Sequence, residues 1–179
     1  GLVLLQHLLG TLDFAELAAA VSALPEEKRT ALYTAGGLAL AGFGAKAGMF
    51  PLHIWLPKAH PVAPAPASAL LSGILTKSGV FGILLLSRYL FWAELSWSRV
   101  VLALGVVTMV LGAVLALFSI DLKRTLACSS MSQIGFILVG VAMQGFLGHE
   151  NALAAWGTVL HMLNHSLIKL VLFVAAGVV

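Results

Sequence analysis

Two long stretches of this chain contain no charged residue. One covers residues 100–120 and the other residues 125–149. An α-helix rises about 1.5 Å per residue, so each stretch can cross a hydrocarbon layer about 30 Å thick. Only 9% of the 179 residues are charged and 60% are apolar, whereas roughly a quarter of the residues in a soluble domain are charged. We therefore predict an integral membrane protein, which excludes a soluble enzyme, a nucleic-acid-binding domain and a disordered segment.

Three other apolar stretches have the length of a membrane span but contain embedded ionisable residues. They are residues 30–50 with Lys46, residues 67–87 with Lys77, and residues 151–179 with His161, His165 and Lys169. No segment alternates apolar and polar residues as the strands of a membrane barrel do. The sequence therefore predicts an all-α, polytopic bundle of transmembrane helices with about five full spans.

The first thirty residues have a different character. Residues 1–10 are predicted to be the end of a sixth helix. Residues 11–29 hold four of the seven acidic side chains beside a few apolar ones, which indicates an amphipathic connector on the membrane surface or an ordinary loop. Because both ends of the chain are apolar, we expect residues 1–179 to be the central part of one transmembrane domain, truncated at both ends.

Residues 50–66 hold five of the six prolines. Proline lacks a backbone N–H and disfavours helix in the residue before it, so a regular helix is not expected to continue through this segment. Three glycines and Pro51 also surround Lys46. We predict a discontinuous helix near Lys46 and Pro51, followed by an interfacial link whose histidines, His53 and His60, lie in loops and have no assigned role.

The ionisable residues inside the spans are the strongest functional signal. A lysine at the centre of a bilayer costs about 2.5–3.5 kcal/mol on insertion scales, and such residues usually face the bundle interior or an ion pathway. His161, His165 and Lys169 are spaced i, i+4, i+8, which places them within about 80° of one helix face. Since histidine titrates near neutral pH, these side chains are predicted to relay protons. The alternatives are a polar seam that only joins helices and a metal site on the two histidines.

The two other embedded lysines are expected in polar surroundings. Lys46 is predicted beside a cavity with its partner carboxylate outside this chain, because no acid here lies at a matching depth; the alternative is a side chain that extends to the membrane surface. Lys77 follows Ser68, Ser72 and Thr76, which are spaced i, i+4, i+8. This polar stripe predicts that Lys77 faces the interior of the bundle, since packing of small residues alone does not explain a lysine.

Four motifs, in this order, resemble those of one family. They are KAGMFPLHIWLPKAH at residues 46–60, SALLSGILTK at 68–77, DLKRTLACSSMSQIG at 121–135, and HMLNHSLIK at 161–169. Together they resemble the antiporter-like membrane subunits shared by respiratory complex I, membrane-bound hydrogenases and multi-subunit sodium/proton antiporters. Within that family, the details are most similar to the large membrane subunit of hydrogenase-4 and formate hydrogenlyase.

The resemblance implies a role for each embedded residue. Lys46 corresponds to the lysine of the first half-channel, which pairs with a glutamate expected before the first residue. Lys77 corresponds to a connecting lysine found in some branches, and His161, His165 and Lys169 correspond to the central hydrophilic axis. The family has two inverted repeats, so a second broken helix is expected after residue 179. No cofactor and no metal are expected in this chain.

The function implied is proton translocation through this lysine/histidine axis, coupled to electron transfer in other subunits. The expected partners are other membrane subunits, the lipid bilayer, protons or Na⁺, and a redox module; nucleic acid is not expected. The expected location is the plasma membrane of a bacterium or archaeon. Two alternatives remain: a cation/proton antiporter subunit without a redox partner, and a structural scaffold whose polar axis carries nothing.

Overall fold

The computed structural model describes residues 1–92, 94–150 and 152–178, except for the side chain of His149. The predicted span limits at residues 151 and 179 lie outside this described part. The described elements are α1 (Leu2–Leu9), α2 (Phe14–Ser22), α3 (Glu26–Ala47), α4 (Trp55–Val62), α5 (Ala65–Leu70), the π-helix η1 (Leu71–Leu75), α6 (Thr76–Leu85), the π-helix η2 (Leu86–Leu90), α7 (Leu95–Leu117), α8 (Leu122–Leu147), the 3₁₀-helix η3 (Gly148–Glu150) and α9 (Ala152–Ala175).

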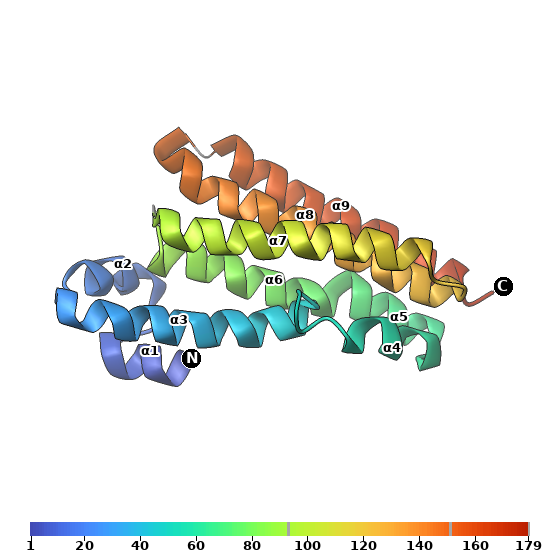
Figure 1. Ribbon diagram of the computed structural model, residues 1–179, viewed down its shortest axis with the longest axis horizontal. Helices are drawn as coiled ribbons and strands as arrows, with labels where there is room; N and C mark the ends of the chain where they lie inside the picture. The colour runs from blue at the N-terminus through green and yellow to red at the C-terminus, as the bar shows by residue number, and fades with distance from the viewer. Residues whose placement is uncertain (93, 151, 179) are drawn as a thin grey trace.

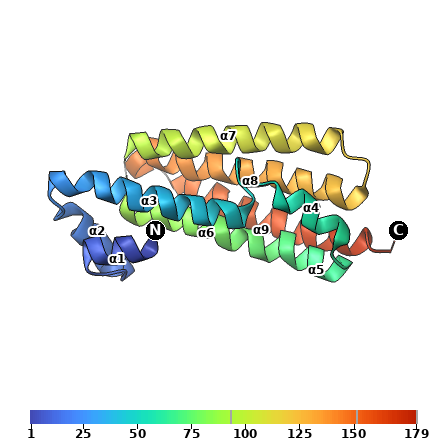
Figure 2. The same ribbon diagram turned by 60° about the horizontal axis from the view of Figure 1, so that its bottom comes forward.

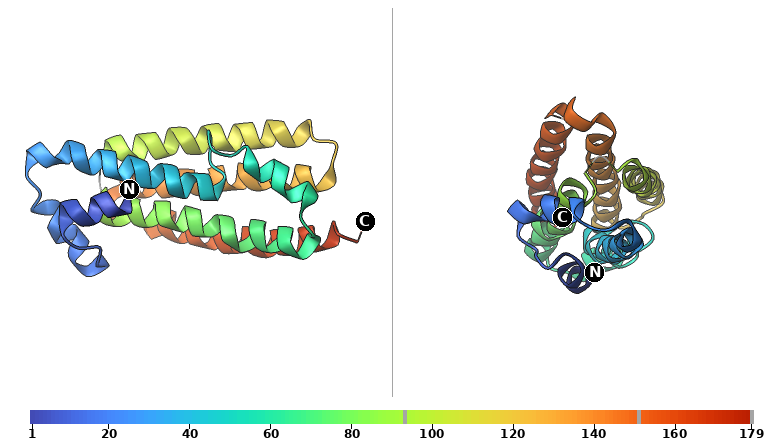
Figure 3. Two further views of the ribbon diagram at one scale, coloured as in Figure 1. Left: turned by 90° about the horizontal axis from the view of Figure 1, so that it is seen from below. Right: turned by 90° about the vertical axis from the view of Figure 1, so that its left-hand side faces the viewer.

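The long helices run side by side along one axis (Figures 1 and 2). Within the described residues, four are long and apolar enough to cross a membrane: the continuous helix Ala65–Leu90, then α7, α8 and α9. Seen along the axis, they pack together with α3 as a bundle (Figure 3). The prediction of an all-α, polytopic membrane bundle is confirmed.

The predicted span at residues 30–50 forms α3, which has the length of a span but is less apolar than the other four. Its first turn contains Glu26 and Glu27, which suit the positive end of the helix dipole. The helix ends at Ala47 because Gly48 adopts a left-handed conformation with φ of 79°, which favours glycine. The discontinuity predicted near Lys46 and Pro51 is therefore present, and it begins at Gly48.

The segment rich in proline is more helical than the sequence analysis predicted. It forms α4 and α5, with a connection between them. Pro57 lies in the first turn of α4, and Pro64 and Pro66 lie at the start of α5, where the missing backbone N–H would have no helical partner. Pro61, near the end of α4, removes only one hydrogen bond. The prediction that His60 lies in a loop is wrong, since it belongs to α4.

The opposite end of the bundle carries α1 and α2 (Figure 1). These two helices are bent by 63° relative to each other. The side chain of Asp13 caps α2 by accepting a hydrogen bond from the backbone N–H of Ala15 at 2.9 Å, and Leu17 of α2 is buried in the core. The helix α2 therefore packs across the end of the bundle rather than along it.

Glycines bring the helices of the bundle unusually close to each other. A Cβ atom built on Gly135 of α8 would lie 2.6 Å from the carbonyl oxygen of Gly105 in α7. A Cβ on Gly79 of α6 would lie 2.5 Å from the carbonyl oxygen of Phe43 in α3. Small residues allow such close approach of helices in membranes. The positions of α3, α6, α7 and α8 therefore depend on these glycines.

Candidate functional site

Two lysines are buried between the long helices. Lys77 of α6 is 6% exposed and Lys169 of α9 is 4% exposed, and each lies in a helix apolar enough to cross a membrane. An ammonium group at that depth needs acceptors from the protein, because hydrocarbon provides none. The acceptors that these two lysines use define the candidate site.

Lys77 donates to a carbonyl group of its own span. Its Nζ lies 2.5 Å from the carbonyl oxygen of Ser72, and the Thr76 hydroxyl donates to the same oxygen at 3.1 Å. Ser72 belongs to the π-helix η1, in which backbone hydrogen bonds reach the fifth residue instead of the fourth. Such π turns inside α-helices are frequent at functional sites, and here the widened turn coincides with the acceptor of a buried lysine.

Lys169 reaches across to the neighbouring span. Its Nζ donates to the carbonyl oxygen of Leu126 at 3.0 Å and to Oγ of Ser129 at 2.5 Å. Both acceptors belong to α8. The Ser129 hydroxyl itself donates to the Leu126 carbonyl at 2.9 Å. The amine of α9 is therefore held by a hydroxyl and a carbonyl of one turn of α8.

A pair of buried hydroxyls joins the surroundings of the two lysines. Oγ of Ser72 and Oγ of Ser130 are 2.8 Å apart, and either can be the donor. Ser130 also lies 2.9 Å from the Leu126 carbonyl, which is the acceptor of Lys169. Hydrogen bonds thus connect the two lysines, although Lys77 contacts the carbonyl of Ser72 whereas Ser130 contacts its hydroxyl. We call the six residues of this connection the lysine–serine network: Lys77, Ser72, Ser130, Leu126, Ser129 and Lys169.

Two histidines continue this site along α9. His165 is 4% exposed, and its ring lies 6.4 Å from the ring of His161 with an angle of 12° between the two planes. Within the described part of the chain, both ring nitrogens of His165 lack a hydrogen-bond partner, and so does Nε2 of His161. The predicted arrangement of His161, His165 and Lys169 on one helix brings Lys169 and His165 into the interior and leaves His161 half-buried.

No carboxylate of the described residues pairs with either buried lysine; the ion pairs present there join Arg29 to Glu26 and to Glu94. Over the same residues, no group of three or more His, Cys, Asp or Glu side chains is arranged to hold a metal ion. The groups of the site that can bind or release a proton are the amines of Lys77 and Lys169, the serine hydroxyls and the imidazoles of His161 and His165.

A family model described as "NADH:quinone oxidoreductase/Mrp antiporter, TM" matches residues 1–179. The chain belongs to this family. The sequence analysis identified a resemblance to the antiporter-like membrane subunits of this family, and that prediction is confirmed.

Three relatives are named as a component, a subunit or a chain of an enzyme. The chain is 47% identical to hydrogenase-4 component B of Escherichia coli, over 79% of this chain and 22% of the relative. It is 43% identical to formate hydrogenlyase subunit 3 of E. coli, with 78% and 24% covered. It is also 43% identical to an NAD(P)H-quinone oxidoreductase chain 4 of Picosynechococcus, with 78% and 25% covered.

A solved structure shares the fold as well. The structure of the Mrp complex from Dietzia contains a chain that superposes with a TM-score of 0.84 at 29% identity, over 98% of this chain and 31% of that one. This chain therefore spans between about a fifth and a third of the length of these four relatives.

The structure does not bring Lys46, the remaining predicted site residue, to the lysine–serine network. Lys46 is exposed on α3, two residues before the Gly48 break. The carbonyl of Ala45, beside it, is satisfied by the indole N–H of Trp55 at 2.7 Å. The cavity predicted next to Lys46 and its pairing with a carboxylate both stay predictions.

His60 is a buried residue that the sequence analysis missed. Its side chain is fully buried, its ring stacks on that of Phe173 at 4.4 Å, and Lys169 and Lys77 are its charged neighbours. One signal could have found it, because Leu56, Pro57 and His60 all lie on the buried face of a short helix. Treating residues 50–66 as a loop concealed that periodicity.

Two of the three serines of the network were also missed. The motif at residues 121–135 was quoted for the resemblance, but Ser129 and Ser130 received no role in the sequence analysis. A turn of helix that contains adjacent serines in a membrane span offers hydroxyls to a neighbouring helix. Nothing in the sequence of α8 alone shows that Lys169 and Ser72 are the neighbours.

Proposed function

We propose that this chain is part of a proton-translocating subunit of a membrane-bound redox complex, with Lys77, His161, His165 and Lys169 carrying protons. The observation that carries the proposal is the lysine–serine network, because it connects embedded lysines of two different spans. Embedded ionisable residues are costly, and those that persist usually mark an ion or proton pathway. The names of the relatives, a hydrogenase component, a formate hydrogenlyase subunit and a quinone oxidoreductase chain, support a redox complex.

The chemistry of the network fits proton transfer. A hydroxyl can accept a proton from one neighbour while giving its own to another, whereas a carbonyl oxygen only accepts. Lys77 donates to the carbonyl of Ser72, so transfer requires its amine to turn to the hydroxyl of the same residue. That hydroxyl already contacts Ser130. Ser130 and Lys169 both donate to the Leu126 carbonyl. The last step therefore requires these two side chains to leave that carbonyl and form a hydrogen bond directly with each other.

The proposed route continues along α9 from Lys169 to His165 and His161. An imidazole can accept a proton at one nitrogen and release one at the other. The ring centres of the two histidines are 6.4 Å apart, and water molecules commonly bridge polar groups that are too far apart for a direct hydrogen bond. We therefore propose that transfer between His165 and His161 passes through water.

The remaining parts of the proposal concern groups outside this chain. We propose that the exposed amine of Lys46 pairs with a carboxylate of another segment or subunit, and that electron transfer takes place in partner subunits. The chain itself would then bind no redox cofactor and no metal. Its location would be the plasma membrane of a bacterium or archaeon, beside other membrane subunits of the complex.

Proton uptake by inverted membrane vesicles tests the proposal. The vesicles come from cells that carry each variant in the native gene, and NADH, formate and hydrogen are supplied in turn as electron donors. We expect Lys77→Met to reduce the initial rate of proton uptake by about tenfold or more, because positioned acid–base groups contribute factors of about 10²–10⁴. Lys58, which is exposed on α4, supplies the control Lys58→Met, which should pump normally. If Lys77→Met assembles and pumps at the unchanged rate, the proposal fails.

A second candidate function is cation/proton exchange without a redox partner. The solved Mrp complex, whose fold this chain shares at a TM-score of 0.84, supports it. In this case the vesicles would not acidify with any electron donor. Instead, adding Na⁺ to vesicles that already hold a pH gradient would collapse the gradient.

A further inference from the structure

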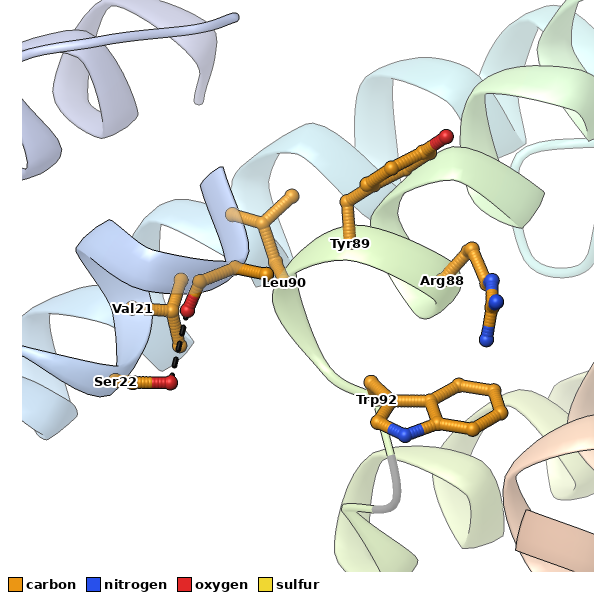
Figure 4. A pocket seen from close by; sticks show the side chains of 7 residues that line it. Val21, Ser22, Arg88, Tyr89, Leu90 and Trp92 are labelled. Atoms are coloured by element: carbon orange, nitrogen blue, oxygen red, sulfur yellow. Dashed lines mark hydrogen bonds between the residues drawn. The ribbon is translucent and has the colours of Figure 1, made fainter. Parts of the chain in front are cut away.

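A cationic pocket lies where α2 packs against the C-terminal end of the helix Ala65–Leu90, the helix that also carries Ser72 and Lys77. The pocket has a volume of about 350 Å³. Arg88, Tyr89 and Trp92 contribute side chains from one wall, and Val21 and Ser22 of α2 lie across from them (Figure 4). We propose that this pocket binds the headgroup of an anionic phospholipid. The inference does not rest on the proposed function.

The first step concerns the positive charge of Arg88, which no carboxylate of the described residues balances by an ion pair. The guanidinium of Arg88 lies over the ring of Trp92, 4.2 Å from its centroid; such stacking holds the planar group in place and leaves its edge N–H groups free to donate. In the described residues, no carboxylate forms an ion pair with Arg88. The acid nearest in sequence, Glu94, is engaged by Arg29 at 3.4 Å and by the Tyr33 hydroxyl at 2.9 Å. The pocket thus has an exposed guanidinium that is positioned by stacking and paired with no carboxylate of the described residues.

The second step is the depth of the pocket. Arg88 lies two residues before the end of a helix that is long and apolar enough to cross a membrane. Tyr89 and Trp92 are the residue types of the aromatic belt at the level of lipid headgroups. Guanidinium groups bind phosphate with two parallel hydrogen bonds. At this depth, a phosphate group is most abundant as the phosphodiester of a lipid.

The third step separates a lipid from free phosphate. A second pocket, of about 250 Å³, lies beside the first and shares Leu90 and the helix α2 with it. Its lining is apolar and includes Leu5, Phe14 and Leu17. The ring of Phe14 contacts that of Tyr89, with centroids 5.0 Å apart, so the two pockets adjoin at this aromatic pair. A cationic pocket next to an apolar one matches a headgroup with its acyl chain, and free phosphate would use only the first.

The experiment uses the native membrane complex purified in mild detergent, with a photoreactive phosphatidylglycerol as the probe. Mass spectrometry then measures the label on the segments 14–22 and 86–92. We expect labelling that is about tenfold stronger than with a photoreactive phosphatidylcholine of the same chains, because one charge-assisted contact corresponds to a factor of this order. The variant Arg88→Gln should reduce the labelling by about tenfold.

Two controls make the result specific. Arg99 is exposed in the first turns of α7, so Arg99→Gln removes the same charge nearby and should leave the labelling unchanged. Ser22→Trp fills the pocket from α2 without altering Arg88, and it should block the labelling even if Arg88→Gln does not assemble. An equal loss in Arg88→Gln and Arg99→Gln would show a general charge effect and overturn the proposal.

A competition arm distinguishes the source of the phosphate. Excess inorganic phosphate should not displace the lipid probe, because it makes no use of the apolar pocket. Displacement by inorganic phosphate alone would show a phosphate site and contradict the assignment to lipid. Equal labelling by phosphatidylglycerol and phosphatidylcholine would show that Arg88 selects no anion, and it would overturn the proposal too.

Discussion

The carbonyl oxygen of Leu126 receives more donors than it can hold at one time. The hydroxyls of Ser129 and Ser130 and the amine of Lys169 all lie within 3.0 Å of it. A carbonyl oxygen has two lone pairs, and the backbone N–H of the helix also uses it. The side-chain donors must therefore compete, and exchange among them is the motion that proton transfer through the network requires.

Replacing Ser130 tests whether the network carries protons. Ser130→Ala removes the only hydroxyl that touches both Ser72 and the Leu126 carbonyl in the described structure. We expect the initial rate of proton uptake in inverted vesicles to fall about tenfold, while Ser130→Thr, which keeps a hydroxyl, retains most of it. Ser132→Ala, in the same helix and also buried, is the control. Equal rates for Ser130→Ala and Ser130→Thr would exclude the hydroxyl from the pathway.

At the residue scale, the sequence predicted the cations better than their partners. Spacing of i, i+4, i+8 and the cost of burying charge were enough to select Lys77, His165 and Lys169, and all three are buried. The same reasoning could not find Ser130, because a serine in a membrane span costs little and gives no signal by itself. The same reasoning also selected Lys46, which lies exposed on α3, and its pairing with a carboxylate stays a prediction.

At the scale of the elements, the helices α7 and α8 pack closely because glycines, which have no side chain, lie where the two helices meet. The Cβ position of Gly135 lies 2.6 Å from the Cα atom of Met109 and 2.6 Å from the carbonyl oxygen of Gly105. These are backbone atoms, which cannot rotate away as a side chain can. Any larger residue at Gly135 must separate the two helices. Because Ser129 and Ser130 are on α8, that separation would also move the network.

We therefore predict that Gly135→Val destabilises the folded protein by about 1–3 kcal/mol, the usual cost of overpacking. Gly37 of α3 has nothing within 4 Å of its Cβ position, so Gly37→Val is a control with the same change of side chain. The thermal unfolding midpoint of the purified complex measures both. Similar midpoints for the two variants would contradict the close approach of α7 and α8.

The element boundaries show why composition predicted so much of this fold. The charge-free stretches at 100–120 and 125–149 correspond to α7 and α8, but each helix begins and ends a few residues earlier than its stretch. The helices begin earlier because their first turns contain polar and charged residues that precede the apolar stretch. Residues 50–66 were less predictable. Prolines at the start of a helix are tolerated and prolines in its middle are not, so their effect depends on a helix start that the sequence does not reveal.

On the scale of the whole molecule, the bundle separates two kinds of charge. The ion pairs among Glu26, Arg29 and Glu94 lie near α2 and the start of α7, whereas no carboxylate of the described residues forms an ion pair with Lys77 or Lys169. Composition and charge gaps predicted the membrane class and the spans. They could not predict this separation, because it arises from the way that the spans pack against one another.

The hydrogen bonds that the two lysines donate lead to a prediction about the coupling ion. Na⁺ binds to several oxygen ligands, and a site for it beside amines also needs negative charge to offset the repulsion between cations. The nearest oxygens, on Ser72, Leu126 and Ser129, already accept hydrogen bonds from ammonium groups. We therefore expect proton uptake in vesicles to be the same in sodium-free buffer and in buffer with added Na⁺, with K⁺ as the control for ionic strength. Uptake that requires Na⁺ and is lost in Lys169→Met would instead assign cation exchange to these residues.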